Sequence, residues 1–297
     1  MKKLCFIVVG IALLTAFYAC QKELLGEYNP KMRIEKIYNE TDSHYLLEQW
    51  VWNESTLSKI DRFRSSGNIL YTDNYVYDEQ NRLARIERDN QYTEFLYEGK
   101  LLTTINTYSN KKLVETYHLT YEKDKVAHIS IEKPTKGAGN VDLFSLFLPG
   151  NADMMESVFP TKDSKIETYN YSSVKMDFQW DGDNVRYLEM EIVRPDSTQH
   201  LTFTYIYDNS INPKNGFLSL QLDRSLINDQ PQYVFCSKNN VRNVLVSEMY
   251  DIYAHTESFT YSYDCYKDYP TKVYATSPNW ETGMDDSTLI YTYVYVY

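Results

Sequence analysis

One short pattern recurs along this chain and restricts its fold more than any other feature. An aromatic residue is followed directly by Asp, Glu or Asn, then by an aliphatic residue about five positions on and usually another about three after that. In the stretch Asn74–Arg88, Tyr77-Asp78 leads to Leu83 and Ile86. The copies begin at Trp52, Tyr77, Tyr97, Tyr121, Trp180, Tyr207 and Tyr263, the last two with longer connections, to Phe217 and Val273. Such self-similarity predicts one supersecondary unit used repeatedly.

The residue types in the repeat predict a β-hairpin. Asp and Asn side chains accept hydrogen bonds from backbone N–H groups two residues on and so start turns, and Gly99 and Gly182 allow a positive φ. Residues before the aromatic alternate, as in Phe203, Tyr205 and Tyr207, which is the strand signal. We therefore predict a mainly all-β fold, a long antiparallel meander sheet that is twisted or partly rolled, with repeat aromatics that are structural and at least half-buried. Whether the sheet closes into a barrel is left open.

One segment departs from this pattern. Residues 133–140 read as a loop, and residues 142–159 have apolar positions at helical spacing, interrupted by Pro149-Gly150. We predict a short helical insertion within 133–160 of a single β domain spanning 41–297. It would be a lid, a membrane-touching element or, as we favour, a plug over an open apolar sheet face.

The N-terminus predicts export and lipid attachment. Residues 1–19 combine Lys2 and Lys3 with a short apolar run, which indicates a signal peptide. Cys20 follows a small residue and is the predicted lipid attachment site, with 20–40 as an anchor linker; a soluble secreted protein or a signal anchor are the alternatives. Gln21-Lys22-Glu23 is similar to the charged tag that carries lipoproteins to the outer face of the outer membrane. We therefore expect an outer-membrane lipoprotein exposed at the cell surface, with the periplasmic face as the alternative.

The net charge limits the classes of binding partner, and the cysteines limit the possible disulfides. The formal net charge is −11, and the predicted signal contains two Lys and no acid, so the exported chain is more acidic still. That argues against nucleic acid and anionic membrane surfaces, which both require basic patches. An oxidising envelope permits a disulfide between Cys236 and Cys265; two free buried thiols are the favoured alternative.

Motifs for chemistry are missing from the sequence. The five His residues are scattered singly, and no phosphate loop, nucleophile elbow or metalloprotease motif is present. Asp181-Gly-Asp-Asn184 reads as a repeat turn and not as a calcium loop. We predict no catalytic residue, no metal and no cofactor. Carboxylate pairs such as Glu189 and Glu191 leave a glycosidase open, because sequence cannot give their separation.

Two family resemblances extend this reading. The Tyr77-Asp78 and Arg82-Leu83 core resembles the tyrosine–aspartate repeats of Rhs-type shell proteins, which usually have Gly before the Arg where this chain has Asn81. Those arrays enclose a toxin, and no cargo domain follows here. The chain is also similar to Bacteroidetes outer-membrane lipoproteins with a domain of unknown function; the shared segments are Tyr207-Asp208 with Asn212-Pro213, Ser237–Val241, and Tyr263-Asp264 with Tyr269-Pro270-Thr271. This resemblance implies location and fold but no activity.

Two classes of function follow. The first is a non-enzymatic surface protein that binds or scaffolds a glycan or a protein; the alternative is an envelope glycan hydrolase with carboxylates from distant strands. An integral membrane barrel is disfavoured because many strands carry Glu, Lys and Arg opposite the aromatics. Trp280 lies in a turn-rich stretch outside the repeat, so we predict a candidate binding site of Trp280, Asn279, Asp285 and Asp286. The alternative is that Trp280 packs back onto the sheet.

Overall fold

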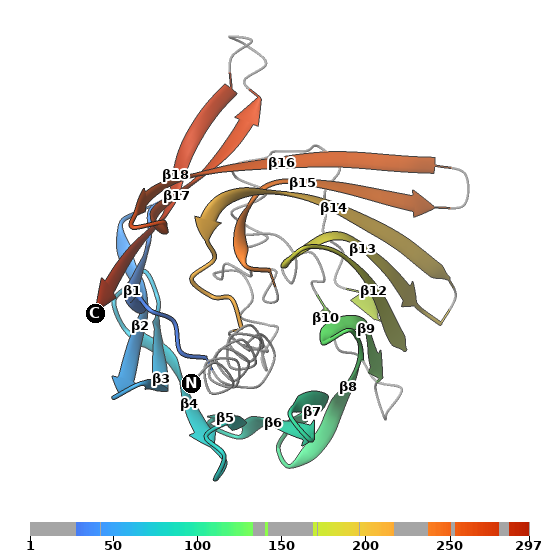
Figure 1. Ribbon diagram of the computed structural model, residues 1–297, viewed down its shortest axis with the longest axis horizontal. Helices are drawn as coiled ribbons and strands as arrows, with labels where there is room; N and C mark the ends of the chain where they lie inside the picture. The colour runs from blue at the N-terminus through green and yellow to red at the C-terminus, as the bar shows by residue number, and fades with distance from the viewer. Residues whose placement is uncertain are drawn as a thin grey trace, which may run out of the picture.

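The computed structural model describes residues 28–41, 43–132, 140–141, 169–170, 172–195, 197–216, 237–250, 253–278 and 285–296. Sixteen antiparallel strands form one closed barrel in which neighbours in sequence are neighbours in space (Figure 1). They are β1 (Arg33–Asn39), β2 (Tyr45–Asn53), β3 (Thr56–Phe63), β4 (Ile69–Tyr77), β5 (Leu83–Arg88), β6 (Gln91–Glu98), β7 (Leu101–Ser109), β8 (Lys112–Glu122), β9 (Lys125–Glu132), β12 (Ser173–Asp181), β13 (Asn184–Val193), β14 (Thr198–Ile211), β15 (Asn239–Tyr250), β16 (Tyr253–Tyr266), β17 (Tyr269–Pro278) and β18 (Asp285–Val296). A separate two-stranded sheet pairs β10 (Asn140–Val141) with β11 (Tyr169–Asn170).

The all-β, antiparallel prediction is confirmed, but the sheet is a closed barrel and not a partly rolled meander. Closure comes from β1 pairing with β18, with Ile34 opposite Tyr295 and Asn39 opposite Tyr291. Pairing of the two edge strands leaves no edge of the sheet without a partner. β1 lies within residues 20–40, which the sequence assigns to a linker, so that assignment is wrong for Arg33–Asn39. Its buried apolar residues Ile34 and Ile37 are three apart, because the register shifts between Ile34 and Lys36, so the segment lacks the period-two signal of a strand.

The repeat aromatics join each hairpin to the strand before it. Each donates a side-chain hydrogen bond to a backbone carbonyl of that neighbouring strand. The donor and acceptor pairs are Trp52 with Ile34, Tyr77 with Leu57, Tyr97 with Leu83, Tyr121 with Leu102, Trp180 with Val126, Tyr207 with Val185, Tyr263 with Val241, and Tyr295 with Pro270. These eight side chains are partly buried and pack against the core, and we call their end of the barrel the aromatic rim. The sequence repeat therefore encodes a ring of bonds around that rim.

Tyr295 is the eighth repeat aromatic, and its hairpin is assembled from the two ends of the described chain. It is followed by Val296 and so lacks the acid or amide of the other copies. Its partner strand is β1, where the register shifts between Ile34 and Lys36. Tyr77 faces Leu83 with the same kind of shift beside it. Sixteen strands are thus eight units, one of them split.

Turn chemistry at the aromatic rim follows the prediction. The Asp78 carboxylate accepts hydrogen bonds from the backbone N–H groups of Gln80 and Arg82 at 2.9 and 2.8 Å. Gly99 and Gly182 have φ of 61° and 58°, values that glycine adopts at little cost. The tight turns and the bulges beside them coil the sheet strongly enough to close.

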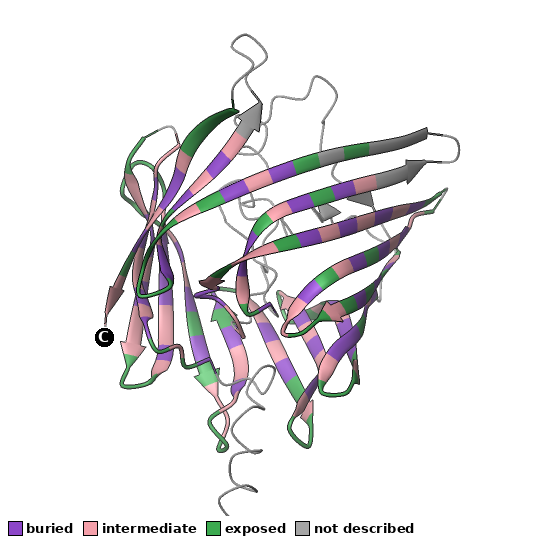
Figure 2. Ribbon diagram, turned by 45° about the horizontal axis from the view of Figure 1, so that its top comes forward, coloured by how far each residue is buried: buried purple, intermediate pink, exposed green. Residues whose placement is uncertain are grey.

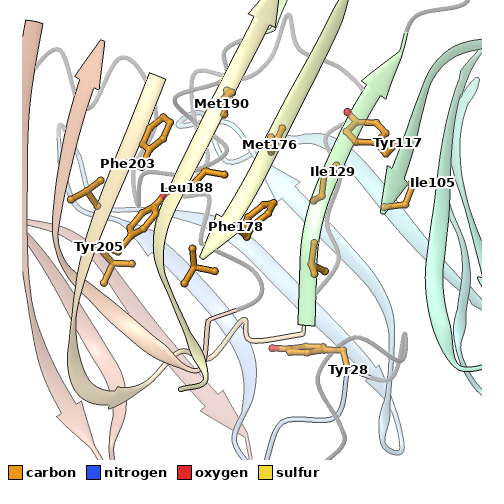
Figure 3. Close-up of a cluster of buried hydrophobic side chains, with 14 of the residues drawn as sticks. Tyr28, Ile105, Tyr117, Ile129, Met176, Phe178, Leu188, Met190, Phe203 and Tyr205 are labelled. Atoms are coloured by element: carbon orange, nitrogen blue, oxygen red, sulfur yellow. The ribbon is translucent and has the colours of Figure 1, made fainter. Parts of the chain in front are cut away.

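The core lies inside the barrel, and the outer face combines charged residues with some exposed apolar side chains, among them Val76, Leu96 and Ile206. Along each strand buried and exposed residues alternate (Figure 2). Inward side chains on adjacent strands pack together; they include Phe203, Leu188, Met190, Met176, Phe178 and Ile129 (Figure 3). Outward positions carry pairs such as Lys175 with Glu191 and Arg85 with Glu94, each at 2.8 Å.

The predicted helical insertion lies outside the described residues, apart from the strand residues Asn140 and Val141. The described residues contain no helix. Within these residues there is accordingly no helix with the length and apolar character that crossing a membrane requires.

Candidate functional site in the barrel interior

Some units of the repeat have polar residues at positions on the inner wall where other units have apolar ones. Two inward positions of each unit lie above the aromatic rim. One is four residues before the aromatic, and the other is five after the residue whose carbonyl accepts the bond from the next unit's aromatic, such as Leu57, Leu83 or Pro270. In the first three units these positions are polar, and they hold Glu48, Arg62, Asp73, Arg88, Thr93 and Thr107. In the next four units the same positions hold Tyr117, Ile131, Met176, Met190, Phe203, Val246, Phe259 and Ala275. We call the six polar residues the polar band; all are at most 4% exposed.

Four members of the polar band form a chain of ion pairs across β2 to β5. Arg62 Nε lies 3.2 Å from Glu48 Oε1, and Arg62 Nη1 lies 2.9 Å from Asp73 Oδ2. Arg88 holds the same Asp73 carboxylate through Nε at 2.6 Å and Nη2 at 2.9 Å. The Tyr71 ring packs against both guanidinium groups, at 5.3 and 3.5 Å from ring centroid to Cζ. Charge-assisted bonds of this kind fix each carboxylate in place.

A segment from the far wall reaches the polar band. After β14 the chain turns into the barrel (Figure 1), where Lys214 Nζ lies 3.8 Å from Glu48 Oε2 and 5.5 Å from the centre of the Trp50 ring. The Tyr28 hydroxyl donates to the carbonyl of Pro213. The Tyr28 ring also lies 6.1 Å from the Trp50 ring. Two segments distant in sequence therefore cross the interior and meet at β2.

Electrostatics keep the Glu48 carboxylate ionised. Burial alone would raise the pKa of Glu48, but the charges of Lys214 and Arg62 and hydrogen bonds from Trp50 and Arg62 lower it below its ordinary value. Burial lowers the pKa of Lys214 to about 8, against the opposing effect of Glu48. A glycosidase requires one carboxyl group whose pKa is raised so that it can donate a proton. Glu48 lacks that property, so this cluster is suited to binding and not to acid catalysis.

Most of the sequence-predicted site residues lie outside the part of the chain that the structure describes. Cys20, Asn279, Trp280 and Cys236 lie outside the described residues. Asp285 and Asp286 are exposed at the start of β18, opposite Pro278 and Ser277 of β17. Their role in binding stays a prediction.

Cys265 is a free thiol, and Cys236 lies outside the described residues, so the disulfide between them stays a prediction. Cys265 is exposed at the end of β16 and not buried as expected. Cys265 belongs to the strand end at the aromatic rim, where its side chain leaves the core face.

The carboxylates considered for other chemistry lie on the outer wall. Glu189 is exposed on β13, and Glu191 pairs with Lys175. Asp181–Asn184 is a turn, as predicted, and Asp183 lies 3.2 Å from Lys125 Nζ. Within the described ranges, no group of three or more His, Cys, Asp or Glu is placed to bind a metal ion.

Sequence reasoning missed the polar band although its signal was present. The repeat is defined by its aromatic and aliphatic positions, and the polar-band positions lie outside them, before the aromatic and after the aliphatic residue. Aligning the units on their aromatics places Glu48, Asp73 and Thr93 at one position, where the later units have Tyr117 and Met176. A run of polar residues at a core position of a repeat would have identified the site.

Comparisons with known proteins add likenesses of fold only. No family model matches, and no curated protein matches. Among solved structures, a porin-like protein from Bacteroides uniformis is 12% identical, with a TM-score of 0.49 over 89% of this chain and 98% of that one. A porin-like protein from Bacteroides vulgatus is 8% identical, with a TM-score of 0.48 over 90% and 99%. The Photorhabdus luminescens Tc holotoxin pore is 13% identical, with a TM-score of 0.27 over 85% of this chain and 14% of that one.

Proposed function

We propose that this chain is an exported, lipid-tethered binding protein of the outer membrane, without enzymatic activity, whose ligand sits inside the barrel. The observation that carries the proposal is the polar band. The fold itself is built equally well with Met176 and Met190, which face each other across β12 and β13 as Glu48 and Arg62 do across β2 and β3. Buried ion pairs are often no more stabilising than apolar residues of similar volume. At these positions polar residues fill three adjacent units, and the neighbouring split unit adds only Asn39; such a grouping indicates recognition.

The outer face supports a tether and not insertion into lipid. Arg85 and Lys175 point outward from the strands, where they pair with Glu94 and Glu191. On the lipid face of a membrane barrel, an Arg or Lys at the bilayer midplane costs about 2–4 kcal/mol. We therefore propose that the barrel stands in water and that the lipid on Cys20 makes the membrane contact.

The enclosed position of the polar band bears on the ligand. The six residues are buried in the barrel wall, and a folded protein partner is too large to reach them. Of the two partner classes that the sequence suggests, a small glycan or another small polar molecule fits this position better. A protein partner would have to use the outer face or a rim.

The tether is tested by fractionation. We expect the wild-type protein to be labelled by fatty acid and to stay with membranes in alkaline carbonate. The Cys20→Ala protein should be unlabelled and soluble without detergent. A Cys20→Ala protein that stays in membranes would contradict both the tether and the water-exposed barrel.

The interior site is tested with a variant that copies another unit. Glu48→Met with Arg62→Met reproduces the pair Met176 and Met190. We expect native mass spectrometry of the protein from envelopes to detect a small molecule on the wild-type chain and none on the folded double variant. Wild-type protein that carries no small molecule, or a variant that carries the same one, would contradict an interior site.

A further inference from the structure

Three buried polar groups at one end of the polar band have no partner. Arg88 uses Nε and Nη2 for Asp73, while its Nη1 makes no hydrogen bond. The Thr93 and Thr107 hydroxyls are also unsatisfied. These statements hold for the part of the chain that the structure describes. Thr93 is 0% exposed, Thr107 3% and Arg88 4%.

The barrel wall places these groups side by side. Arg88, Thr93 and Thr107 lie on the consecutive strands β5, β6 and β7 and face the interior. Thr93 is directly opposite Thr107, and it is also opposite Ile86, the inward residue before Arg88. Directly paired side chains have Cβ atoms about 5 Å apart, and diagonal ones about 7–8 Å. One small chemical group can therefore touch all three.

The fold does not require these hydroxyls. Later units place Val246 and Met190 at the position of Thr107, and both are buried. A buried hydroxyl without a partner destabilises a protein, whereas an apolar residue of the same shape does not. Buried polar groups without a hydrogen-bond partner indicate that a water, an ion or a ligand binds there.

We propose that Arg88, Thr93 and Thr107 bind an oxyanion, the carboxylate or phosphate group of the small ligand inside the barrel. This rests on the proposed interior site and adds the chemical class of the ligand. Arg88 Nη1 and two hydroxyls are all able to donate. The ion chain with Lys214 contains three cations and two carboxylates, so it carries one net positive charge, and Arg88 is one of its two cationic ends.

One carboxylate opposes the anion and fixes its position. Glu115 lies opposite Thr107 on β8, and its Oε2 accepts the Tyr117 hydroxyl at 2.9 Å. An oxyanion is therefore held toward Arg88, on the side of Thr107 away from Glu115.

Isothermal titration of the chain without its signal, at constant ionic strength, tests the proposal with inorganic phosphate and acetate. We expect one saturable site per chain for at least one anion. The isosteric double variant Thr93→Val with Thr107→Val should bind at least about tenfold more weakly and melt no lower than wild type. Thr104→Val, on the outward face of β7, should bind as wild type does.

Three results would overturn the proposal. The first is wild-type protein with no saturable anion binding. The second is a high-resolution structure in which only water bridges the three groups. The third is equal binding by wild type and by the double variant Thr93→Val with Thr107→Val. If the envelope-purified chain still carries an uncharged small molecule in any of these cases, the interior site stands and only the oxyanion is refuted. The assay uses unlipidated protein, so its outcome does not depend on Cys20.

Discussion

Arg62 bridges the buried carboxylates of Glu48 and Asp73. Its removal tests how much these ion pairs contribute to the free energy of unfolding. Arg62→Met leaves Glu48 without its guanidinium partner and weakens the hold on Asp73. Breaking a buried pair by removing one partner costs about 3–5 kcal/mol. Urea unfolding should show that loss, whereas Arg85→Met on the exposed outer face should cost less than about 1 kcal/mol. Equal losses in the two variants would mean that the band is solvated.

Adding the second substitution should restore stability. In Glu48→Met with Arg62→Met, no carboxylate of that pair remains, and Asp73 keeps both bonds to Arg88. Lys214 also loses Glu48, so the comparison is made above about pH 8, the pKa of Lys214, where its amine is mainly neutral. The double variant should therefore unfold at higher urea than Arg62→Met alone. If it is as unstable as the sum of the single variants, the two positions do not act as a pair.

Lys214 gives the protein a pH-dependent stability with a defined sign. Burial lowers its pKa in the folded state to about 8, from an ordinary value of 10.5. Between these values the unfolded chain binds more protons, so this group makes the free energy of unfolding rise with pH. From pH 7.5 to 9.5 wild type should gain on the order of 1–2 kcal/mol relative to Lys214→Met. The difference between the two proteins cancels other titrating groups, and no difference would contradict a buried ammonium.

At the level of the hairpin, the bond from each repeat aromatic should stabilise its unit. Tyr97 donates to the Leu83 carbonyl at 2.8 Å, and Tyr97→Phe removes only the hydroxyl. The expected loss is about 0.5–1.5 kcal/mol by urea unfolding. Tyr92→Phe is the control, since its ring stacks on Tyr108 on the outer face and should change stability by less than about 0.5 kcal/mol. If the Tyr97 variant is as stable as the control, the repeat aromatics stabilise their units by packing and not by this hydrogen bond.

The hairpins could be predicted from sequence because their signals are local. Asp78 begins its turn through its own carboxylate, and Gly99 takes the positive φ that its turn needs. Tyr295 was not recognised as a repeat aromatic because its partner strand lies at the other end of the chain. A local signal cannot reveal a hairpin whose two strands are distant in sequence.

At the level of the whole molecule, closure and the interior site depend on how many units the sheet contains and how strongly they coil. Neither quantity is encoded in one unit. Glu48 and Arg88 are 40 positions apart in sequence, and only the pairing of β2 to β5 brings them into one chain of ion pairs. The predicted binding site around Trp280 was inferred from loop composition, which carries no information about the residues of the inner wall.

A circular permutation tests the split eighth unit directly. Arg33 is paired with Val296, so a short Gly/Ser linker joining the two ends should turn β18 and β1 into an ordinary hairpin. New ends opened between Lys123 and Asp124, in a two-residue turn, should leave a β-type circular dichroism spectrum and one cooperative unfolding transition. The matched control opens the chain between Ile105 and Asn106, inside β7, where the cut breaks pairing on both sides. In every other unit the two strands follow each other along the chain, whereas β1 and β18 meet only if the barrel closes. A closed barrel therefore predicts that the first permutant folds and the second does not. Failure of both would contradict the pairing of β1 and β18 as the eighth unit.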